Sequence, residues 1–347
     1  MSSQDTRSVG DDRDPIVVLA ADDNFAMPLA VTVRSALDNL APGRKLKLYV
    51  LDGGISNTTK DRLLGSWPEG RYHITWLSVD ASTLSGLPIS GHVNLVSYYR
   101  ILIPALLPND LRRVIYLDSD LIVFADLARL WDQDLAGHLC LAVQDCAAPY
   151  IDSSAALANY RHCAQYLGSP QPVPNFRELG LSPQAAYFNA GVLLIDLDAW
   201  RDADLSRHML ECLEQHKQHV LWWDQYALNV VLAGRWGSLD ARWNQGSQVF
   251  MYPTPARSPY DQTTYQQLRT NPYIVHFTTR YKPWLPSCRH PFRKQFFEYV
   301  DCTAWSGWRP SRLGRLSAIL EIAKSQERRL RHGRKKIRRS VAEWFQK

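Results

Sequence analysis

The stretch RVIYLDSDLIVFADLARLWD, residues 113–132, places acidic residues inside a strongly apolar segment. Its apolar residues 114–117 run into the acids Asp118 and Asp120, and a second apolar run, 121–124, follows at once. Carboxylates in so apolar a segment are costly to bury unless a cation or hydrogen-bond donors neutralise them. Residues two apart on a strand share one face, so both carboxylates can bind one hard metal ion. The alternative is a strand that ends in an acid-rich turn with no ligand.

Segments before this stretch alternate between strand and helix patterns. The apolar run 16–21 ends at the acidic turn Asp22-Asp23-Asn24, and residues 46–51 and 72–79 are predicted to be further strands. Residues 27–40 carry apolar side chains at three- and four-residue intervals, which predicts an amphipathic helix. This alternation is typical of α/β proteins with parallel strands, whose ligands bind at the carboxyl ends of the strands.

The pattern continues to about residue 300 without an interrupting linker. We predict a helix over 97–107, a strand over 139–145, an irregular and flexible insertion over 146–185, a strand and helix over 188–201, a helix over 222–233 and a short strand over 274–277. We therefore expect a disordered N-terminus (1–14), one α/β domain with a mostly parallel central sheet (15–305) and a basic helical tail (306–347).

The positive charge is concentrated at the C-terminus. The net charge of the 347 residues is +6, but residues 312–347 alone hold twelve Lys and Arg against three Glu. Apolar positions alternate with these bases, and Trp344 and Phe345 lie near the end of the chain, so a basic amphipathic helix on an anionic membrane is predicted. The alternative is a solvated charged tail. Nucleic-acid binding is not expected, because no recognised module accompanies the basic run.

The cysteines and the N-terminus bear on the compartment. The six cysteines form no C-x-x-C pair, residues 1–14 contain no apolar signal core, and no apolar run is long enough to span a membrane. We expect a cytoplasmic protein with free thiols, peripheral to the inner face of the membrane.

Four acids follow the predicted strands: Asp22, Asp118, Asp120 and Asp145. Carboxyl ends of parallel strands share one edge of a sheet, so these acids are expected to converge, and close carboxylates repel unless a divalent cation lies among them. Asp118 and Asp120 form the natural pair for Mn²⁺ or Mg²⁺ against a diphosphate. His276 adds an imidazole that would favour manganese, although a lone histidine there is more often structural, and a lone Asp22 or Asp145 is more often a cap.

The order of the motifs resembles the family 8 retaining glycosyltransferases, which include bacterial lipooligosaccharide galactosyltransferases and glycogenin. The resemblance covers roughly residues 15–305 and rests on AADDNFA (20–26), SYYR (97–100), YLDSDLIV (116–123), FNAGVLLIDL (188–197), WDQYALN (223–229), HFTTRYKPW (276–284) and HPFRKQFFEYVDCTAW (290–305). Each motif is weak alone, and together they are specific. They imply a GT-A type, Rossmann-like fold that binds a nucleotide sugar.

The resemblance also implies how UDP would be held. Asp22 would accept from the uracil N–H with Ala20 and Asn24 nearby, and Phe25 would stack on the ring, unless it only packs on the next helix. Asp118, Asp120 and His276 would hold manganese at the diphosphate, and Ser119 would meet the ribose.

HFTTRYKPW is similar to the family's H-x-x-G-x-x-K element, in which a glycine backbone and a lysine hold the diphosphate. Lys282 fits this element, but Thr279 stands at the glycine position. Because a β-branched residue disfavours φ > 0, either its hydroxyl replaces a backbone contact or closure over the donor is altered.

By the same resemblance, the sugar would be held by Arg100, Asp145, Asn189, Gly191, Asp224 and Gln225. Gly191 would allow the backbone to approach a ligand closely. The alternative for Arg100 is a salt bridge with no part in ligand binding. The alternative for Asp224 is a favourable charge at the N-terminus of a helix. Family 8 enzymes retain the anomeric configuration. An amide such as Gln225 is a poor nucleophile, so front-face attack is favoured, with Asp224 and Asp145 as the alternative nucleophiles of a double displacement.

We therefore expect a retaining transferase that moves galactose or glucose from a UDP-sugar to a saccharide or glycoconjugate, with lipopolysaccharide or lipooligosaccharide as the expected acceptor. One alternative is transfer to a protein-linked glycan. Another, which follows from Thr279, is a nucleotide-sugar-binding protein with weak catalysis.

Overall fold

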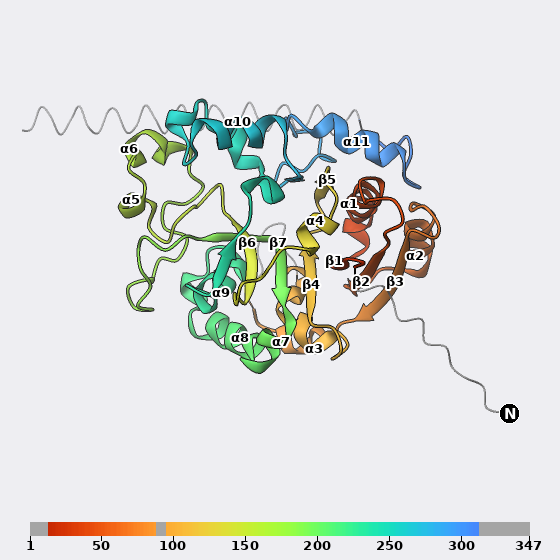
Figure 1. The fold of residues 1–347 in the computed structure, drawn as a ribbon, viewed down its shortest axis with the longest axis horizontal. Helices are drawn as coiled ribbons and strands as arrows, with labels where there is room; N and C mark the ends of the chain where they lie inside the picture. The colour runs from red at the N-terminus through yellow and green to blue at the C-terminus, as the bar shows by residue number, and fades with distance from the viewer. Residues whose placement is uncertain (1–12, 88–94, 312–347) are drawn as a thin grey trace, which may run out of the picture.

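A seven-stranded sheet forms the centre of the computed structural model, which describes residues 13–87 and 95–311 (Figure 1). The strands lie in the order β3-β2-β1-β4-β7-β6-β8. Their bounds are β1 (Ile16–Ala21), β2 (Leu46–Asp52), β3 (Tyr72–Ser78), β4 (Arg113–Leu117), β6 (Cys140–Gln144), β7 (Phe188–Asp196) and β8 (Trp236–Ser238). The predicted α/β fold with a mostly parallel sheet is confirmed. The predicted basic tail from residue 312 onward and residues 1–12 lie outside the described part.

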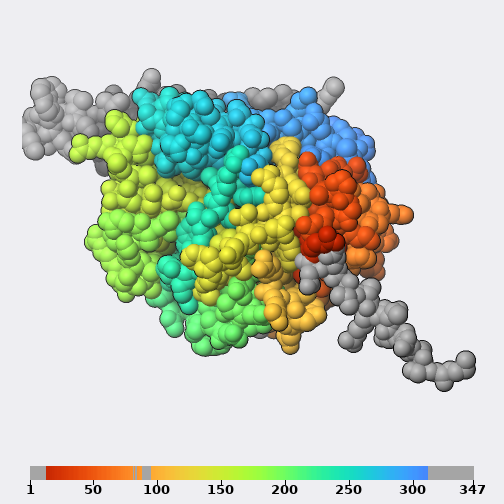
Figure 2. Space-filling model, viewed as in Figure 1, coloured from red at the N-terminus to blue at the C-terminus, as the bar shows by residue number. Residues whose placement is uncertain are grey.

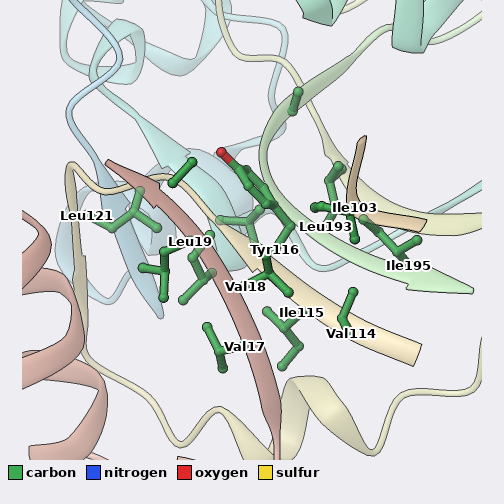
Figure 3. Packing of buried hydrophobic residues seen from close by; sticks show 14 of the residues in the cluster. Val17, Val18, Leu19, Ile103, Val114, Ile115, Tyr116, Leu121, Leu193 and Ile195 are labelled. Carbon is green, nitrogen blue, oxygen red and sulfur yellow. The ribbon is translucent and has the colours of Figure 1, made fainter. Parts of the chain in front are cut away.

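The core lies around the central strands of this sheet. All six residues of β1 are buried, and in β4 and β7 the apolar positions are buried on both faces. Figure 3 shows their side chains packed together, with Val18, Ile115 and Leu193 contributed by three adjacent strands. Such continuous apolar runs belong to strands that are covered on both faces.

Helices and short helical turns surround the sheet. The α-helices are α1 (Ala26–Asp38), α2 (Asn57–Leu64), α3 (Ile103–Leu106), α4 (Ala128–Trp131), α5 (Ser153–Ala156), α6 (Tyr160–Cys163), α7 (Leu197–Asp202), α8 (Leu205–Gln215), α9 (Trp223–Val231), α10 (Gln262–Thr270) and α11 (Arg293–Asp301). The helix predicted over 97–107 is a 3-10 helix, η3 (Leu95–Leu102), followed by α3. Pro104 has no N–H to donate, so one continuous α-helix cannot run through this segment. The segment 146–185 holds only short turns such as α5 and α6, in agreement with its predicted irregularity.

One strand direction differs from a purely parallel arrangement. β7 is antiparallel to both of its neighbours, β4 and β6. The first residues of β7 therefore lie at the same edge as the last residues of β1, β4 and β6. This edge collects Asp22, Asp118, Asp145 and Asn189, each of which adjoins or begins one of these strands.

A second, three-stranded sheet completes this edge. It consists of β5 (Leu121–Val123), β10 (Ile274–His276) and β9 (Gln245–Gly246), in the order β5-β10-β9. The antiparallel pairing of β10 with β5 places His276 opposite Leu121, directly after Asp120. On the other side, the buried hydroxyl of Thr32 on α1 accepts from the backbone N–H of Leu121 at 3.0 Å. The pairing and the helix together fix the backbone between β4 and β5.

The ends of the described chain rest on this body. Asp14, within the segment predicted to be disordered, accepts a hydrogen bond from the Lys45 N–H at 3.0 Å. At the other end, Arg309 forms an ion pair of 2.6 Å with Asp301 of α11, and α10 and α11 form the upper side of the molecule in Figure 2. All six cysteines are unpaired, as predicted. No helix within residues 13–87 and 95–311 is long and apolar enough to cross a membrane.

Candidate active site

A cavity of about 470 Å³ opens at the edge where the strand ends meet. Its wall contains most of the residues that the sequence singled out: Ala20, Asp22, Phe25, Arg100, Asp118, Ser119, Asp120, Asp145, Asn189, Asp224, Gln225, His276, Thr279 and Lys282. Asn24 is exposed and, like Gly191, is not part of the wall. The structure thus brings residues from seven separate segments to one place, while their individual roles stay predictions.

The two acids of the D-x-D motif lie in a bend and not on a strand. β4 ends at Leu117 and β5 starts at Leu121, so the backbone turns between them. Inside this bend, the Ser119 hydroxyl donates to the Ala20 carbonyl at 2.7 Å. The predicted contact of Ser119 with a ribose would therefore compete with a hydrogen bond inside the protein.

Asp118, Asp120 and His276 form a compact group of possible metal ligands. One ligand atom from each residue lies within 4.8 Å of the other two. The His276 Nε2 is 3.5 Å from Asp118 Oδ2 and 3.3 Å from Asp120 Oδ1. Ligands at about 2.1 Å from an octahedral ion lie about 3 Å apart when adjacent, so this arrangement fits one small divalent cation. Two carboxylates and one imidazole are a donor set that suits a divalent cation.

Gly191 makes this group possible. A Cβ at position 191 would lie 2.2 Å from His276 Cε1 and 2.7 Å from Asp118 Oδ2. The groups that come closest to Gly191 are the side chains of the possible metal ligands, and the predicted close approach of its backbone to a bound sugar stays a prediction. Its absence from the cavity wall follows, because His276 and Asp118 cover it.

Two cationic side chains each pair with one carboxylate oxygen of these acids. Arg100 Nη2 lies 2.8 Å from Asp118 Oδ1, and the Lys282 ammonium donates to Asp120 Oδ2. Each carboxylate therefore directs its other oxygen to His276. Burial alone would raise the pKa of Asp120, but the Lys282 ammonium and the His276 imidazole outweigh it and hold this pKa well below its usual value. Asp120 is thus ready to bind a cation at neutral pH.

Arg100 links the acids to the deeper part of the cavity. Its Nε lies 2.8 Å from Asp224 Oδ2, and its Nη1 donates to the Ala190 carbonyl at 2.6 Å. Burial raises the pKa of Asp224 to about 6, against the opposing effect of the Arg100 charge. The salt bridge that we weighed for Arg100 exists, and it lies within the cavity wall.

Asp145 organises the remaining polar wall. Its Oδ1 accepts from the Ala147 N–H at 2.6 Å, and its Oδ2 accepts from Asn189 Nδ2 and Gln225 Nε2, both at 2.9 Å. The Gln225 Oε1 accepts in turn from the Ala190 N–H at 3.1 Å. The amides of Asn189 and Gln225 are therefore held in one orientation, since a carboxylate can only accept.

The turn after β1 supplies the opposite end of the cavity. Asp22 caps the 3-10 turn Asp23–Phe25 by accepting from the Phe25 N–H at 3.0 Å. Phe25 contacts the Trp284 ring edge-on, with 5.7 Å between ring centroids, and also faces the cavity. The capping role that we weighed for Asp22 is therefore present alongside its place in the wall.

Two backbone conformations bear on the site. Among the described residues other than glycine, only Ala136, Asp204 and Trp223 have positive φ, so Thr279 does not need the conformation that a threonine disfavours. Trp223 does adopt it, with φ of 43°, directly before Asp224. Strained backbone of this kind is often found at functional sites.

The sequence did not direct attention to several residues of the site. Tyr116 donates to Asp118 Oδ1 at 2.9 Å, and Trp222 and Trp223 line the cavity. Asn244 lies behind the His276 ring, with 2.9 Å between Asn244 Oδ1 and His276 Nδ1. The Trp222-Trp223 doublet before an acid was a usable signal, whereas nothing in the local sequence distinguishes Asn244.

The fold is that of an α/β protein with a polar cavity at the strand ends, and comparison with known proteins identifies its class. The profile of glycosyl transferase family 8 matches residues 16–288, and the chain belongs to this family. General stress protein A of Bacillus subtilis (strain 168) is 31% identical over 293 residues, which are 84% of this chain and 94% of that protein.

Two further relatives have names that describe a reaction. Lipopolysaccharide 1,3-galactosyltransferase of Salmonella typhimurium is 23% identical over 294 residues, 84% of this chain and 79% of that protein. The crystal structure of the galactosyltransferase LgtC with donor and acceptor sugar analogs superposes with a TM-score of 0.68 at 25% identity, covering 83% of this chain and 96% of that one. The GT-A type of fold expected from the motifs is thereby confirmed, and the protein is a glycosyltransferase of family 8.

Proposed function

We propose that this protein is a retaining glycosyltransferase that moves galactose or glucose from a UDP-sugar to a saccharide or glycoconjugate. The observation that carries the proposal is the group of Asp118, Asp120 and His276 beside a cavity whose far wall holds Asp145 and Gln225. The first three suit a divalent cation at a diphosphate, and the hydrogen-bonding side chains beyond suit a hexose. The names of the Salmonella relative and of LgtC support a lipopolysaccharide or lipooligosaccharide acceptor.

Asp118, Asp120 and His276 would hold manganese, or magnesium, which neutralises the charge that develops on the leaving diphosphate. Lys282 would contribute a second positive charge on the same side. Asp22 and Phe25, which line the cavity just after β1, would contact the uracil. Arg100 and Asp224 would orient the sugar through its hydroxyls.

The wall of the cavity favours front-face substitution. In this reaction the acceptor oxygen bonds to the anomeric carbon on the face from which the phosphate oxygen leaves, and that oxygen takes the acceptor's proton. Gln225 is an amide held by Asp145 and the Ala190 N–H, and Asp145 is occupied as a hydrogen-bond acceptor. Gln225 is therefore a poor nucleophile, and the hydrogen bonds that Asp145 accepts weaken its carboxylate as one. The alternative, a double displacement, would use Asp224 or Asp145, and a glycosyl adduct on either, trapped with a slow donor analogue, would refute front-face attack.

A donor-panel assay tests the proposal directly. UDP-galactose and UDP-glucose are incubated with the protein and Mn²⁺ or EDTA, with saccharide acceptors, and sugar transfer and UDP release are followed. Asp118→Asn and Asp120→Asn should each lower turnover by more than about 100-fold, because each removes several kcal/mol of charge stabilisation. Asp132→Asn, at an exposed acid paired loosely with Arg44 at 3.6 Å, serves as the matched control. Binding of UDP-sugars without turnover would favour a weakly catalytic binding protein, and transfer only to a protein-linked glycan would favour the other alternative acceptor.

We further propose that residues 312–347 hold the enzyme at the inner face of an anionic membrane in the cytoplasm, close to a membrane-embedded acceptor. The charge of this segment supports the idea, since twelve of its residues are Lys or Arg. Liposome sedimentation of the full chain and of a chain that ends at residue 311 tests it. Equal pelleting of the two chains would exclude docking through this segment.

A further inference from the structure

Asn244 lies behind His276, outside the cavity wall. It is the last residue of the 3-10 turn η6 (Ala241–Asn244), and β9 begins directly after it. The parallel pairing of β9 with β10 places Gly246 opposite His276, which brings Asn244 to the ring. The side chain of Asn244 is buried, with 4% of the residue exposed, and its Oδ1 lies 2.9 Å from His276 Nδ1.

A chain of hydrogen bonds fixes the orientation of the Asn244 amide. The Asp145 carboxylate can only accept, so Asn189 must direct its Nδ2 there, at 2.9 Å. The Asn189 Oδ1 then accepts from the Gly191 N–H at 3.0 Å and from Asn244 Nδ2 at 2.9 Å. This leaves the Asn244 Oδ1 to face the His276 ring.

The orientation of Asn244 decides which ring nitrogen of His276 carries the proton. An amide oxygen can only accept, so His276 Nδ1 must donate to it, and in the neutral ring, the form that binds a metal ion, Nε2 then keeps its lone pair. That lone pair points to the carboxylate oxygens of Asp118 and Asp120, at 3.5 and 3.3 Å. Three acceptors then converge on one point, which is the arrangement that a cation requires.

We propose that Asn244 is the positioning residue of the metal site, which holds His276 as the Nδ1–H tautomer with Nε2 directed at the ion. Asn244 does not line the cavity, so it acts on the ion only through His276. Its link through Asn189 to Asp145 connects the metal side of the cavity to the side where the sugar would lie. The inference rests on the proposed metal-dependent function. Partners that orient a ligating histidine in this way commonly change metal affinity by about 10- to 100-fold when they are removed.

The test compares Asn244→Ala with the full-length wild type. Binding of Mn²⁺ is measured by electron paramagnetic resonance of the free ion, with and without UDP, and we expect Asn244→Ala to bind about 10- to 100-fold more weakly. The matched control is Asn175→Ala. Asn175 is also a buried asparagine beside a histidine, with its Nδ2 3.4 Å from His216 Nδ1, but it does not belong to the cavity. It should lose comparable stability and keep the Mn²⁺ affinity of the wild type.

A second measurement needs no metal. The ¹⁵N chemical shifts of the imidazole nitrogens of His276 in the metal-free wild type should show a protonated Nδ1 and a bare Nε2, and Asn244→Ala should lose this preference. A wild type with the proton on Nε2 would overturn the proposal, as would an Asn244→Ala variant with unchanged tautomer and Mn²⁺ affinity. A wild type that binds no Mn²⁺ would refute the metal site of the proposed function, and the tautomer would still decide the role of Asn244. If Asn244→Ala does not fold, the tautomer of the wild type alone gives the answer.

Discussion

Replacing Gly191 by alanine should disable the metal site by steric displacement alone. The new Cβ would lie 2.2 Å from His276 Cε1 and 2.7 Å from Asp118 Oδ2. Carbon atoms pack at about 3.5–4.0 Å, so the His276 ring would have to move by more than about 1 Å. Metal–ligand distances tolerate only about 0.2 Å. The backbone itself is no obstacle, because Gly191 is not among the glycines with positive φ.

The magnitude follows from this displacement. Overpacking of a filled interior costs about 1–3 kcal/mol of stability, which the fold can bear. Removing a residue that is hydrogen-bonded to a metal ligand lowers metal affinity by about 10- to 100-fold. Displacing the ligand His276 itself should lower the Mn²⁺ affinity at least as much. Sugar transfer should fall with the metal affinity.

The assay pairs Mn²⁺ titration with urea unfolding of Gly191→Ala and of the control Gly237→Ala. In β8, a Cβ at position 237 would lie 2.5 Å from Leu141 Cδ2 and 2.6 Å from His138 Cδ2, so it overpacks the interior without touching the site. Both variants should lose stability, and only Gly191→Ala should lose Mn²⁺ affinity. Wild-type affinity in Gly191→Ala, or an equal loss in both variants, would refute the reasoning.

Three further changes test the charges. Arg100→Lys should cost about 3–5 kcal/mol of stability and much of the donor affinity, measured by urea unfolding and by UDP-sugar titration, since one ammonium cannot serve both Asp118 and Asp224. Because burial raises the pKa of Asp224 to about 6, the folded state binds this proton more tightly than the unfolded chain does, and the contribution of Asp224 to stability should decline as pH rises from about 4 to 6. In Asp224→Asn this decline, roughly 3 kcal/mol, should vanish from the curve of unfolding free energy against pH. Burial lowers the pKa of His290, which packs 4.7 Å from the Phe277 ring, to about 4, so the contribution of His290 to stability should be lost as pH falls from about 6.5 to 4, opposite in sign to that of Asp224. His290→Phe should remove up to roughly 3 kcal/mol of that acid sensitivity, and an unchanged acid limb would contradict the account.

The sequence alone was sufficient for several of the central strands and for the edge at which the site lies. Uninterrupted apolar runs such as 16–21 and 114–117 predict buried strands because burial on both faces leaves no polar positions. The acids that follow these runs then stand at strand ends, where α/β proteins bind ligands. These are properties of spacing along one chain, and they led to Asp22, Asp118 and Asp145 without any coordinates.

Only the tertiary structure decided how the site is assembled. The antiparallel direction of β7 brings Asn189 to the acids, and the pairing of β10 with β5 brings His276 there. The same packing leaves Asn24 outside the cavity. It also places the His276 ring against Gly191, where a Cβ would not fit. Asn244 reaches that ring across 32 positions of the sequence. Such contacts depend on strand direction and register, which arise when distant segments pack against one another, so no local pattern of residues contains them.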